Sequence, residues 1–203
     1  MLFRSDEDLN FSKHVTSLCK KTSKQIAIIN RFKKLLSTKT KLLLYKAYIL
    51  PHFTYCSTVW MHCGKTVAGK LEKLNERAMR CIFNDNISTY DELLVKANMP
   101  SLQNTRIQDM CILIFKVIYA TTPTPISGLL SLRSNKCNLR DKMKLILPRA
   151  NTSRYGLHSF RYYGPKMWNS LQDELRTAPT IKHFVSQIRK ITFDTCSCFL
   201  CCT

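Results

Sequence analysis

The sequence predicts a mainly α-helical protein, in which a helical bundle is followed by a small α+β part with a β-hairpin. Three observations support this class. Apolar residues recur at helical spacing through about the first 120 residues, two prolines interrupt the pattern at Thr121–Pro125, and the apolar spacing after them alternates as in a strand. We therefore expect a helical region at 1–122, a small basic α+β region at 126–192, and a disordered cysteine-rich tail at 193–203.

The first region should contain several amphipathic helices. The first follows the apolar residues from Val15 to Leu36, and a second begins at Thr38 or Thr40. Pro51 should kink or restart that second helix, because proline lacks an amide hydrogen and disfavours a helical residue before it. A third helix runs from about Val67 to Phe83. Its apolar seam consists of Leu71, Leu74, Ala78 and Ile82.

Two polar signals mark the starts of later helices. Thr89 and Glu92 have the spacing of a capping box, which satisfies two amide groups at a helix N-terminus. Ser101 precedes a strongly apolar helix that should end before Thr121. The prolines that follow make this segment the best boundary between domains in the chain.

The second region predicts the hairpin and two short helices. Alternating residues indicate a strand at 143–147, the polar segment 149–154 is turn-like, and 157–163 is the second candidate strand. A helix should begin at Gly164-Pro165, with proline in its first turn, and a last helix near Thr180. The residues that we expect these two helices to bury are Trp168, Leu171, Leu175, Phe184 and Ile188.

Charge is the unusual property of this chain. Thirty-two Lys and Arg oppose 13 Asp and Glu, so the formal net charge is +19. A nearby polyanion would relieve the repulsion, and nucleic acid is the first candidate, with an anionic membrane surface second. No apolar run approaches the ~18 residues that a membrane-spanning helix needs. Three acids follow closely on Met1, where a signal peptide is apolar, so we expect an intracellular protein.

Catalytic and cofactor motifs are scarce. A two-metal polymerase or nuclease centre needs converging carboxylates, and the chain contains no Asp-Asp pair. It has five glycines and neither of the common Gly-rich phosphate-binding motifs. We therefore expect no cofactor and no enzyme activity. A cysteine–histidine nucleophile remains an alternative, although nothing selects one of the ten cysteines.

Cysteine and histidine residues raise the question of a metal site. His52, Cys56, His62 and Cys63 supply nitrogen and sulfur ligands, yet their spacing matches no zinc finger and their neighbours suggest a buried helix. The tail, with four cysteines at 196–202, has the thiols to bind a soft metal or be acylated. We expect core packing for the first group and an exposed terminus for the second, hence no metal. The scattered cysteines should be buried thiols rather than disulfides.

Basic residues form the strongest candidate site. Between 133 and 166 nine bases oppose one acid, Asp141, and aromatic residues lie among them. Cations neutralise phosphates, and aromatic rings stack on unpaired bases. The alternative is that the rings form the core face of the hairpin. A second row lies on the helix at 67–83, where Glu72 and Glu76 allow an ordinary salt-bridged surface instead. The candidate nucleic-acid-binding residues are Arg133, Lys136, Arg140, Lys142, Lys144, Arg149, Arg154, Arg161, Lys166, Lys70, Lys73, Arg77 and Arg80.

Several blocks of sequence resemble a known family. The segment Leu42–Cys56, LLLYKAYILPHFTYC, followed by Trp60, closely resembles a block downstream of the polymerase core in reverse transcriptases of non-LTR (LINE-type, jockey-like) retrotransposons. Segments that look like the approach to the thumb, its basic helix and the C-terminal region of that family follow in order. They are Leu9–Val15, Leu71–Ala78, Asn138–Asp141, Phe160–Pro165 and Trp168–Leu171.

The resemblance implies the thumb and post-thumb region of such a polymerase. The family's aromatic-Ala-Asp-Asp box, which holds the metal ions, has no counterpart here. The resemblance therefore implies a non-catalytic fragment that binds RNA or an RNA–DNA hybrid, with a polymerase palm supplied in trans. The alternatives are a helical interaction or structural module whose charge serves solubility, and a relic without function.

Overall fold

The computed structural model describes residues 11–60, 65–119, 121–133 and 143–193. In these ranges the protein is mainly α-helical, with eleven α-helices and two π-helical segments, η1 and η2. Contacts divide the chain into two compact units: a first unit that extends to Arg106 and a second unit, Ile107–Phe193. Each is described separately below. The domain limits expected from the sequence stay a prediction.

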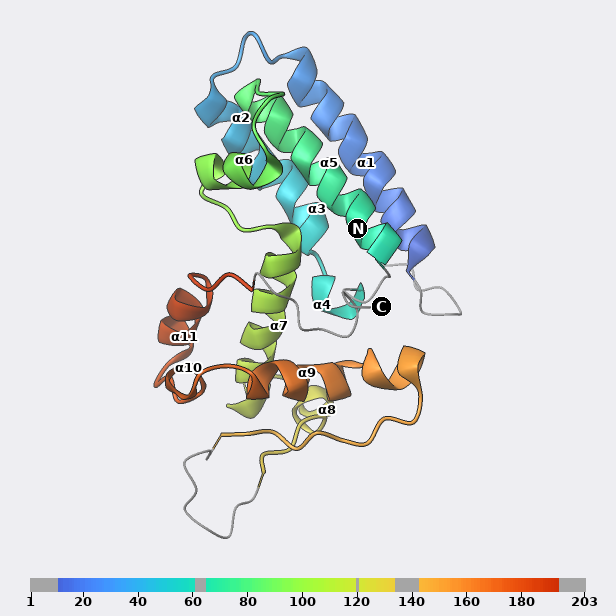
Figure 1. Cartoon of the computed structure of the whole chain (residues 1–203), viewed down its shortest axis with the longest axis vertical. Helices are drawn as coiled ribbons and strands as arrows, with labels where there is room; N and C mark the ends of the chain where they lie inside the picture. Colours follow the sequence, from blue (N-terminus) through green and yellow to red (C-terminus); the bar gives the residue numbers. More distant parts are fainter. Residues whose placement is uncertain (1–10, 61–64, 120, 134–142, 194–203) are drawn as a thin grey trace. The chain divides into compact units, whose positions relative to one another are not determined.

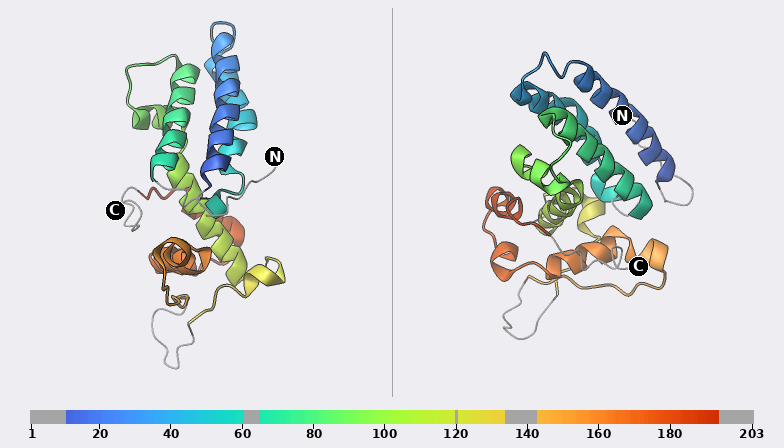
Figure 2. Two further views of the ribbon diagram at one scale, coloured as in Figure 1. Left: turned by 90° about the vertical axis from the view of Figure 1, so that its right-hand side faces the viewer. Right: turned by 45° about the horizontal axis from the view of Figure 1, so that its top comes forward.

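The first unit is built around three helical rods (Figures 1 and 2). They are α1 (Ser12–Arg31), the continuous run α2 (Thr38–Leu44), η1 (Tyr45–Ile49) and α3 (Leu50–Thr54), and α5 (Lys65–Phe83). Helices α1 and α5 lie side by side and run in the same direction. The run from α2 to α3, which connects them in the sequence, runs in the opposite direction. The short helices α4 (Ser57–Trp60) and α6 (Tyr90–Ala97) complete the unit.

The core of the first unit lies between these rods. The predicted seam of the third helix is buried: Leu71, Leu74, Ala78 and Ile82 are all less than a tenth exposed. They pack in one cluster with side chains from the other rods. The largest fully buried partners are Leu18, Ile26, Tyr45, Ile49, Phe53 and Trp60. Burying the apolar stripe of each helix supplies most of the stability of such a unit.

The restart expected at Pro51 takes the form of a π-helical segment. Pro51 lies in the first turn of α3 and has no amide hydrogen to donate. Just before it, the Leu50 amide donates to the Tyr45 carbonyl five residues earlier. A single wide turn of this kind is a common way for a helix to continue past a local mismatch.

Side-chain caps set several helix starts. The Ser37 hydroxyl accepts the Thr40 amide at 3.2 Å at the start of α2. The predicted capping box of Thr89 and Glu92 is confirmed at the start of α6. Ser101 accepts the Asn104 amide at 3.2 Å where α7 (Leu102–Ile118) begins. These oxygens satisfy amides that have no partner within the helix.

The second unit packs helices around an aromatic centre. It comprises the rest of α7 and the helices α8 (Thr124–Ser127), η2 (Ser153–Leu157), α9 (Phe160–Asn169), α10 (Asp173–Arg176) and α11 (Ile181–Ile188). Phe115 of α7 stacks on Phe184 of α11, and both contact the indole of Trp168. The five apolar residues expected to be buried by the last two predicted helices are buried.

The predicted β-hairpin is wrong. In the described residues, 143–147 makes only an isolated antiparallel bridge, between Leu132 and Leu145. The segment 157–163 is not a strand, because α9 already begins at Phe160 and η2 precedes it. The Ser159 hydroxyl caps α9 by accepting the Tyr162 amide at 3.3 Å. A local helix cap and the burial of Tyr163 thus outweigh the strand propensity of this aromatic segment.

Side chains of α9 replace the second strand. The Asn169 amide accepts the Leu145 N–H and donates to the Leu145 C=O, both at 2.9 Å. The Trp168 indole N–H donates to the Met143 carbonyl at 2.7 Å. The extended segment therefore satisfies backbone groups of Leu145 and Met143 against a helix. On its other edge, the Ile146 amide donates to the Ser131 carbonyl and the Lys144 carbonyl accepts the Arg133 amide, both at 2.9 Å.

Candidate nucleic-acid-binding surface

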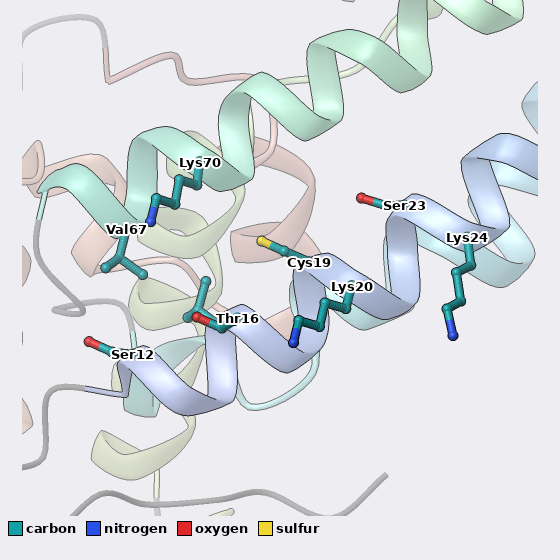
Figure 3. A pocket seen from close by; sticks show the side chains of 9 residues that line it. Ser12, Thr16, Cys19, Lys20, Ser23, Lys24, Val67 and Lys70 are labelled. Carbon is teal, nitrogen blue, oxygen red and sulfur yellow. The ribbon is translucent and has the colours of Figure 1, made fainter.

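A groove whose lining includes three lysines lies between α1 and α5 of the first unit (Figure 3). Its volume is about 560 Å³. Its polar lining comes mainly from α1, together with one lysine of α5. We call this feature the basic groove, and its polar lining residues are Ser12, Thr16, Cys19, Lys20, Ser23, Lys24 and Lys70.

Small side chains on α1 keep the groove open. Ser12, Thr16, Cys19 and Ser23 follow one another at intervals of four, three and four residues, so they share the face of α1 that borders α5. Larger apolar residues there would fill the space between two adjacent helices. Because these side chains are short, the seam between the two helices stays concave.

The cations of the groove have no acidic neighbours on α1. Helix α1 contains no Asp or Glu. Figure 3 shows Lys70 directed into the gap between the helices and Lys20 and Lys24 projecting from α1. None of these three lysines forms an ion pair among the described residues, and all three are exposed. Their charges are therefore available to an anion from outside the protein.

Cys19 reports on the electrostatics of the groove. Partial burial raises the pKa of its thiol above the ordinary value, and the positive charge of Lys70 opposes that rise. The effect of burial on the pKa is larger than the effect of Lys70, so the Cys19 thiol stays protonated at neutral pH. Cys19 therefore lines the groove as a small neutral side chain.

Helix α5 separates its charges onto two sides. Of the predicted row, Lys70, Lys73 and Arg77 are exposed and make no ion pair among the described residues. Arg80 differs, because it binds Glu76 at 2.7 Å and donates to the Ser88 carbonyl at 3.1 Å. The ordinary salt-bridged surface considered from the sequence therefore accounts for Arg80 alone.

The opposite side of α5 carries a hydrogen-bonded chain of polar residues. The Tyr45 hydroxyl donates to Asn75 Oδ1 at 2.5 Å, and Asn75 Nδ2 donates to the Tyr90 hydroxyl at 2.7 Å. That hydroxyl donates to Glu72 at 2.8 Å, and Glu72 also accepts the Gln103 amide. Burial, and then the charge of Glu72, raise the pKa of both tyrosines. Glu72 is thus held away from the lysines.

The basic residues predicted at 133–166 lie in the second unit where they are described. Arg133, Arg149 and Arg161 are exposed, and Lys144 and Lys166 are partly buried. The Arg133 amide donates to the Lys144 carbonyl at 2.9 Å, so these two residues are neighbours. Lys136, Arg140 and Lys142 lie outside the described residues, as does the side chain of Arg154.

The aromatic residues of the same stretch have mixed environments. Tyr155 is 52% exposed, whereas Tyr163 is buried against the core of the second unit. Phe160, Tyr162 and His158 are partly buried, and burial lowers the pKa of His158. Tyr155 is therefore accessible for stacking on a base, as the binding interpretation requires, whereas Tyr163 belongs to the core, as the alternative interpretation requires.

The histidine and cysteine candidates do not assemble in the described ranges, where no cluster of three or more His, Cys, Asp or Glu fits a metal ion. His52 Nε2 lies 3.2 Å from Gln25 Nε2, and Cys56 is exposed. His62, Cys63 and the cysteine tail fall outside the description. Of the described thiols, only Cys111 is buried, which raises its pKa to about 12.

From the sequence, charge reversal on α1 is expected to weaken binding less than charge reversal at 140–149, so α1 was not part of the candidate surface. Lys20 and Lys24 were not among the candidate residues, although they lie four residues apart on a helix without acids. The spacing of small residues beside them was the available signal. Which lysines share a groove depends on the alignment of α1 with α5, which is a long-range property.

Comparisons with known proteins give no family for this chain: no family model, no curated protein and no solved structure matches it. Among the residues that the structure describes, no helix is both long enough and apolar enough to cross a lipid bilayer.

Proposed function

We propose that this protein binds RNA or an RNA–DNA hybrid through its phosphates, as the non-catalytic thumb and post-thumb part of a non-LTR retrotransposon reverse transcriptase. The sequence blocks that resemble this family support the assignment to a polymerase. The observation that carries the binding proposal is the basic groove with its neighbours Lys73 and Arg77. These cations are exposed and form no ion pair with a residue that the structure describes, while the acids of α5 are engaged elsewhere.

Phosphate contacts explain why such a surface would bind nucleic acid of any sequence. Lysine side chains are flexible and carry a compact charge, so they neutralise phosphates without reading base edges. Neutralisation releases condensed counterions, and the logarithm of affinity should fall by about 0.7–0.9 per tenfold increase in salt for each phosphate contacted. A polymerase palm supplied in trans would then act on the strand that this fragment holds.

A salt series of binding measurements tests the proposal. Fluorescence anisotropy with labelled single-stranded RNA and an RNA–DNA hybrid should give an affinity that falls steeply with salt. The variant Lys20→Glu/Lys24→Glu/Lys70→Glu should lose about tenfold or more in affinity at low salt and show a shallower salt dependence.

The control carries the same change of charge outside the groove. Lys39, Lys46 and Lys182 are exposed and do not line it, so Lys39→Glu/Lys46→Glu/Lys182→Glu should bind far better than the groove variant. Equal losses would mean that only net charge matters. Binding that is absent at low salt, or insensitive to salt, overturns the proposal.

Exposed apolar side chains favour a second candidate, a protein-interaction module. Ile87 is 97% exposed, and Leu35 and Val95 are about four-fifths exposed. Single exposed apolar side chains are common on protein surfaces, and they mark an interaction site where they join into one patch. Sedimentation velocity with and without RNA separates the two candidates. An interaction module self-associates or stays free regardless of RNA, whereas a nucleic-acid-binding fragment sediments with the RNA.

A further inference from the structure

Three aromatic rings of the second unit form a continuous stack that ends at the surface. Phe184 and Phe115 are fully or nearly buried, with ring centroids 4.6 Å apart and an angle of 22° between their planes. Tyr119 lies on the Phe115 ring at 4.3 Å with an angle of 27°. The outermost ring of the stack is therefore Tyr119, at the end of α7.

The exposure of Tyr119 shows that this stack is open at its outer end. Tyr119 is 43% exposed although one of its faces rests on Phe115. Phe115 covers one face of the Tyr119 ring, and the remaining exposed surface is accessible to a ligand. Stacking on the buried ring of Phe115 orients the Tyr119 ring roughly parallel to it without any ligand.

The charge around Tyr119 suits a nucleic-acid strand. Lys116, one turn earlier on the same helix, is exposed. No Asp or Glu occurs in the sequence between Asp109 and Asp141, and Asp109 is bound to Arg189 at 2.5 Å. A phosphate beside Tyr119 would therefore find a cation and no competing carboxylate from this stretch of chain.

We propose that Tyr119 is a stacking platform for an unpaired nucleobase. A nucleobase lying on Tyr119 would add a fourth parallel ring to the stack of Phe184, Phe115 and Tyr119. Every base has a flat π-face, so the platform would accept any of them. Lys116 would contact the adjoining phosphate. This inference rests on the proposed nucleic-acid binding, and it adds that the second unit recognises single-stranded nucleic acid through its bases as well as its charge.

Two oligomers of equal length and charge test the platform. An oligodeoxyadenylate and an abasic oligodeoxyribose phosphate differ only in the presence of bases. The wild-type protein should bind the first more tightly, and Tyr119→Ala should weaken binding of that oligomer by about tenfold while leaving the abasic one unchanged. Tyr119→Phe should retain wild-type affinity for both.

Matched variants separate stacking from structural effects. Tyr48 is 63% exposed and lies in the first unit, so Tyr48→Ala should leave both affinities unchanged. In Tyr119→Trp, the introduced indole should be quenched by the oligodeoxyadenylate and not by the abasic oligomer. This readout does not depend on the stability of the alanine variant.

The outcomes distinguish the two proposals. If neither these oligomers nor the labelled RNA and RNA–DNA hybrid bind at low salt, the proposed function and this inference both fail. If the RNA or the hybrid binds and neither oligomer does, the proposed function stands and the stacking platform is overturned. If both bind equally, or if Tyr119→Ala weakens both to the same extent, nucleic-acid binding stands and the stacking platform is overturned. Quenching of the introduced indole by both oligomers overturns the platform as well.

Discussion

The two sides of α5 use the same kinds of residue in opposite ways. On the side toward α6, Glu72, Asn75, Glu76 and Arg80 all have hydrogen-bonded partners within the protein. On the side toward α1, Lys70 and its neighbours have none among the described residues. A polar residue with a fixed internal partner stabilises the fold, whereas a cation without one is available for an external anion. The two sides should therefore respond differently to mutation.

The largest effect is expected at Asn75, on the partnered side. Asn75 is fully buried and joins Tyr45 to Tyr90. Asn75→Ala removes both hydrogen bonds and leaves two tyrosine hydroxyls short of a partner, so the free energy of unfolding should fall by about 2–4 kcal/mol. Urea unfolding followed by circular dichroism measures it. The exposed Asn86 provides the control, since Asn86→Ala should change the free energy of unfolding little. A loss below about 1 kcal/mol for Asn75→Ala would show that the hydrogen bonds of Asn75 with Tyr45 and Tyr90 do not stabilise the fold.

Alkaline pH should destabilise the hydrogen-bonded chain of Tyr45, Asn75 and Tyr90 on the side of α5 that faces α6. Burial and Glu72 raise the pKa of Tyr45 and Tyr90 above the ordinary value of 10.0. The folded state therefore prefers the neutral phenols, and its stability is complete below about pH 10 and falls as the pH rises further. Thermal melts should show this decline in the wild type. It should be shallower in Tyr45→Phe, and Tyr48→Phe should match the wild type; parallel curves for all three proteins would contradict the prediction.

Matched substitutions of Arg77 and Arg80 allow a direct comparison, because both are arginines of α5 and only Arg80 is paired with Glu76. Arg77→Gln should lower RNA affinity severalfold and reduce the salt slope by about 0.7–0.9, while the free energy of unfolding stays within ~0.5 kcal/mol. Arg80→Gln should leave affinity unchanged and lower stability by about 0.5–1 kcal/mol, because it removes the pair with Glu76. If the two variants behave alike, the sides are not functionally distinct.

The smallest effect concerns Cys19 in the groove. Its raised pKa already makes thiol alkylation slow. Bound RNA should slow it further by covering the basic groove, whereas the exposed Cys56 should react at an unchanged rate. Mass spectrometry of both alkylated sites gives the two rates. Protection of both thiols, or of neither, would argue against occupancy of the groove.

Local signals predicted the longer helices of the first unit, and they did not predict the short helices α4, α8 and α10. The apolar seam of α5 and the capping box of α6 depend on residues three or four positions apart, which sequence shows directly. The segment 157–163 was mispredicted because its aromatic residues favour a strand. Its helix is set by the Ser159 cap and by burial of Tyr163 in a core formed from distant segments.

The candidate site was less predictable than the fold. Counting charges identified the lysines and arginines of α5, and it could not show that Arg80 is engaged while Lys70 is not. That distinction depends on which face of α5 meets α1 and which meets α6. For the same reason Lys20 and Lys24 joined the site only once the two helices were placed side by side.

The side chain of Asn169 has a consequence for aggregation. An extended segment such as 143–147 exposes unpaired backbone groups that invite strands from other molecules, the first step toward a cross-β fibril. The Asn169 side chain binds the N–H and the C=O of Leu145, so neither group can pair with a strand from another molecule at that edge. A side chain without an amide at position 169 would leave both groups of Leu145 open to a strand from another molecule, so we expect Asn169→Ala to aggregate more readily than the wild type.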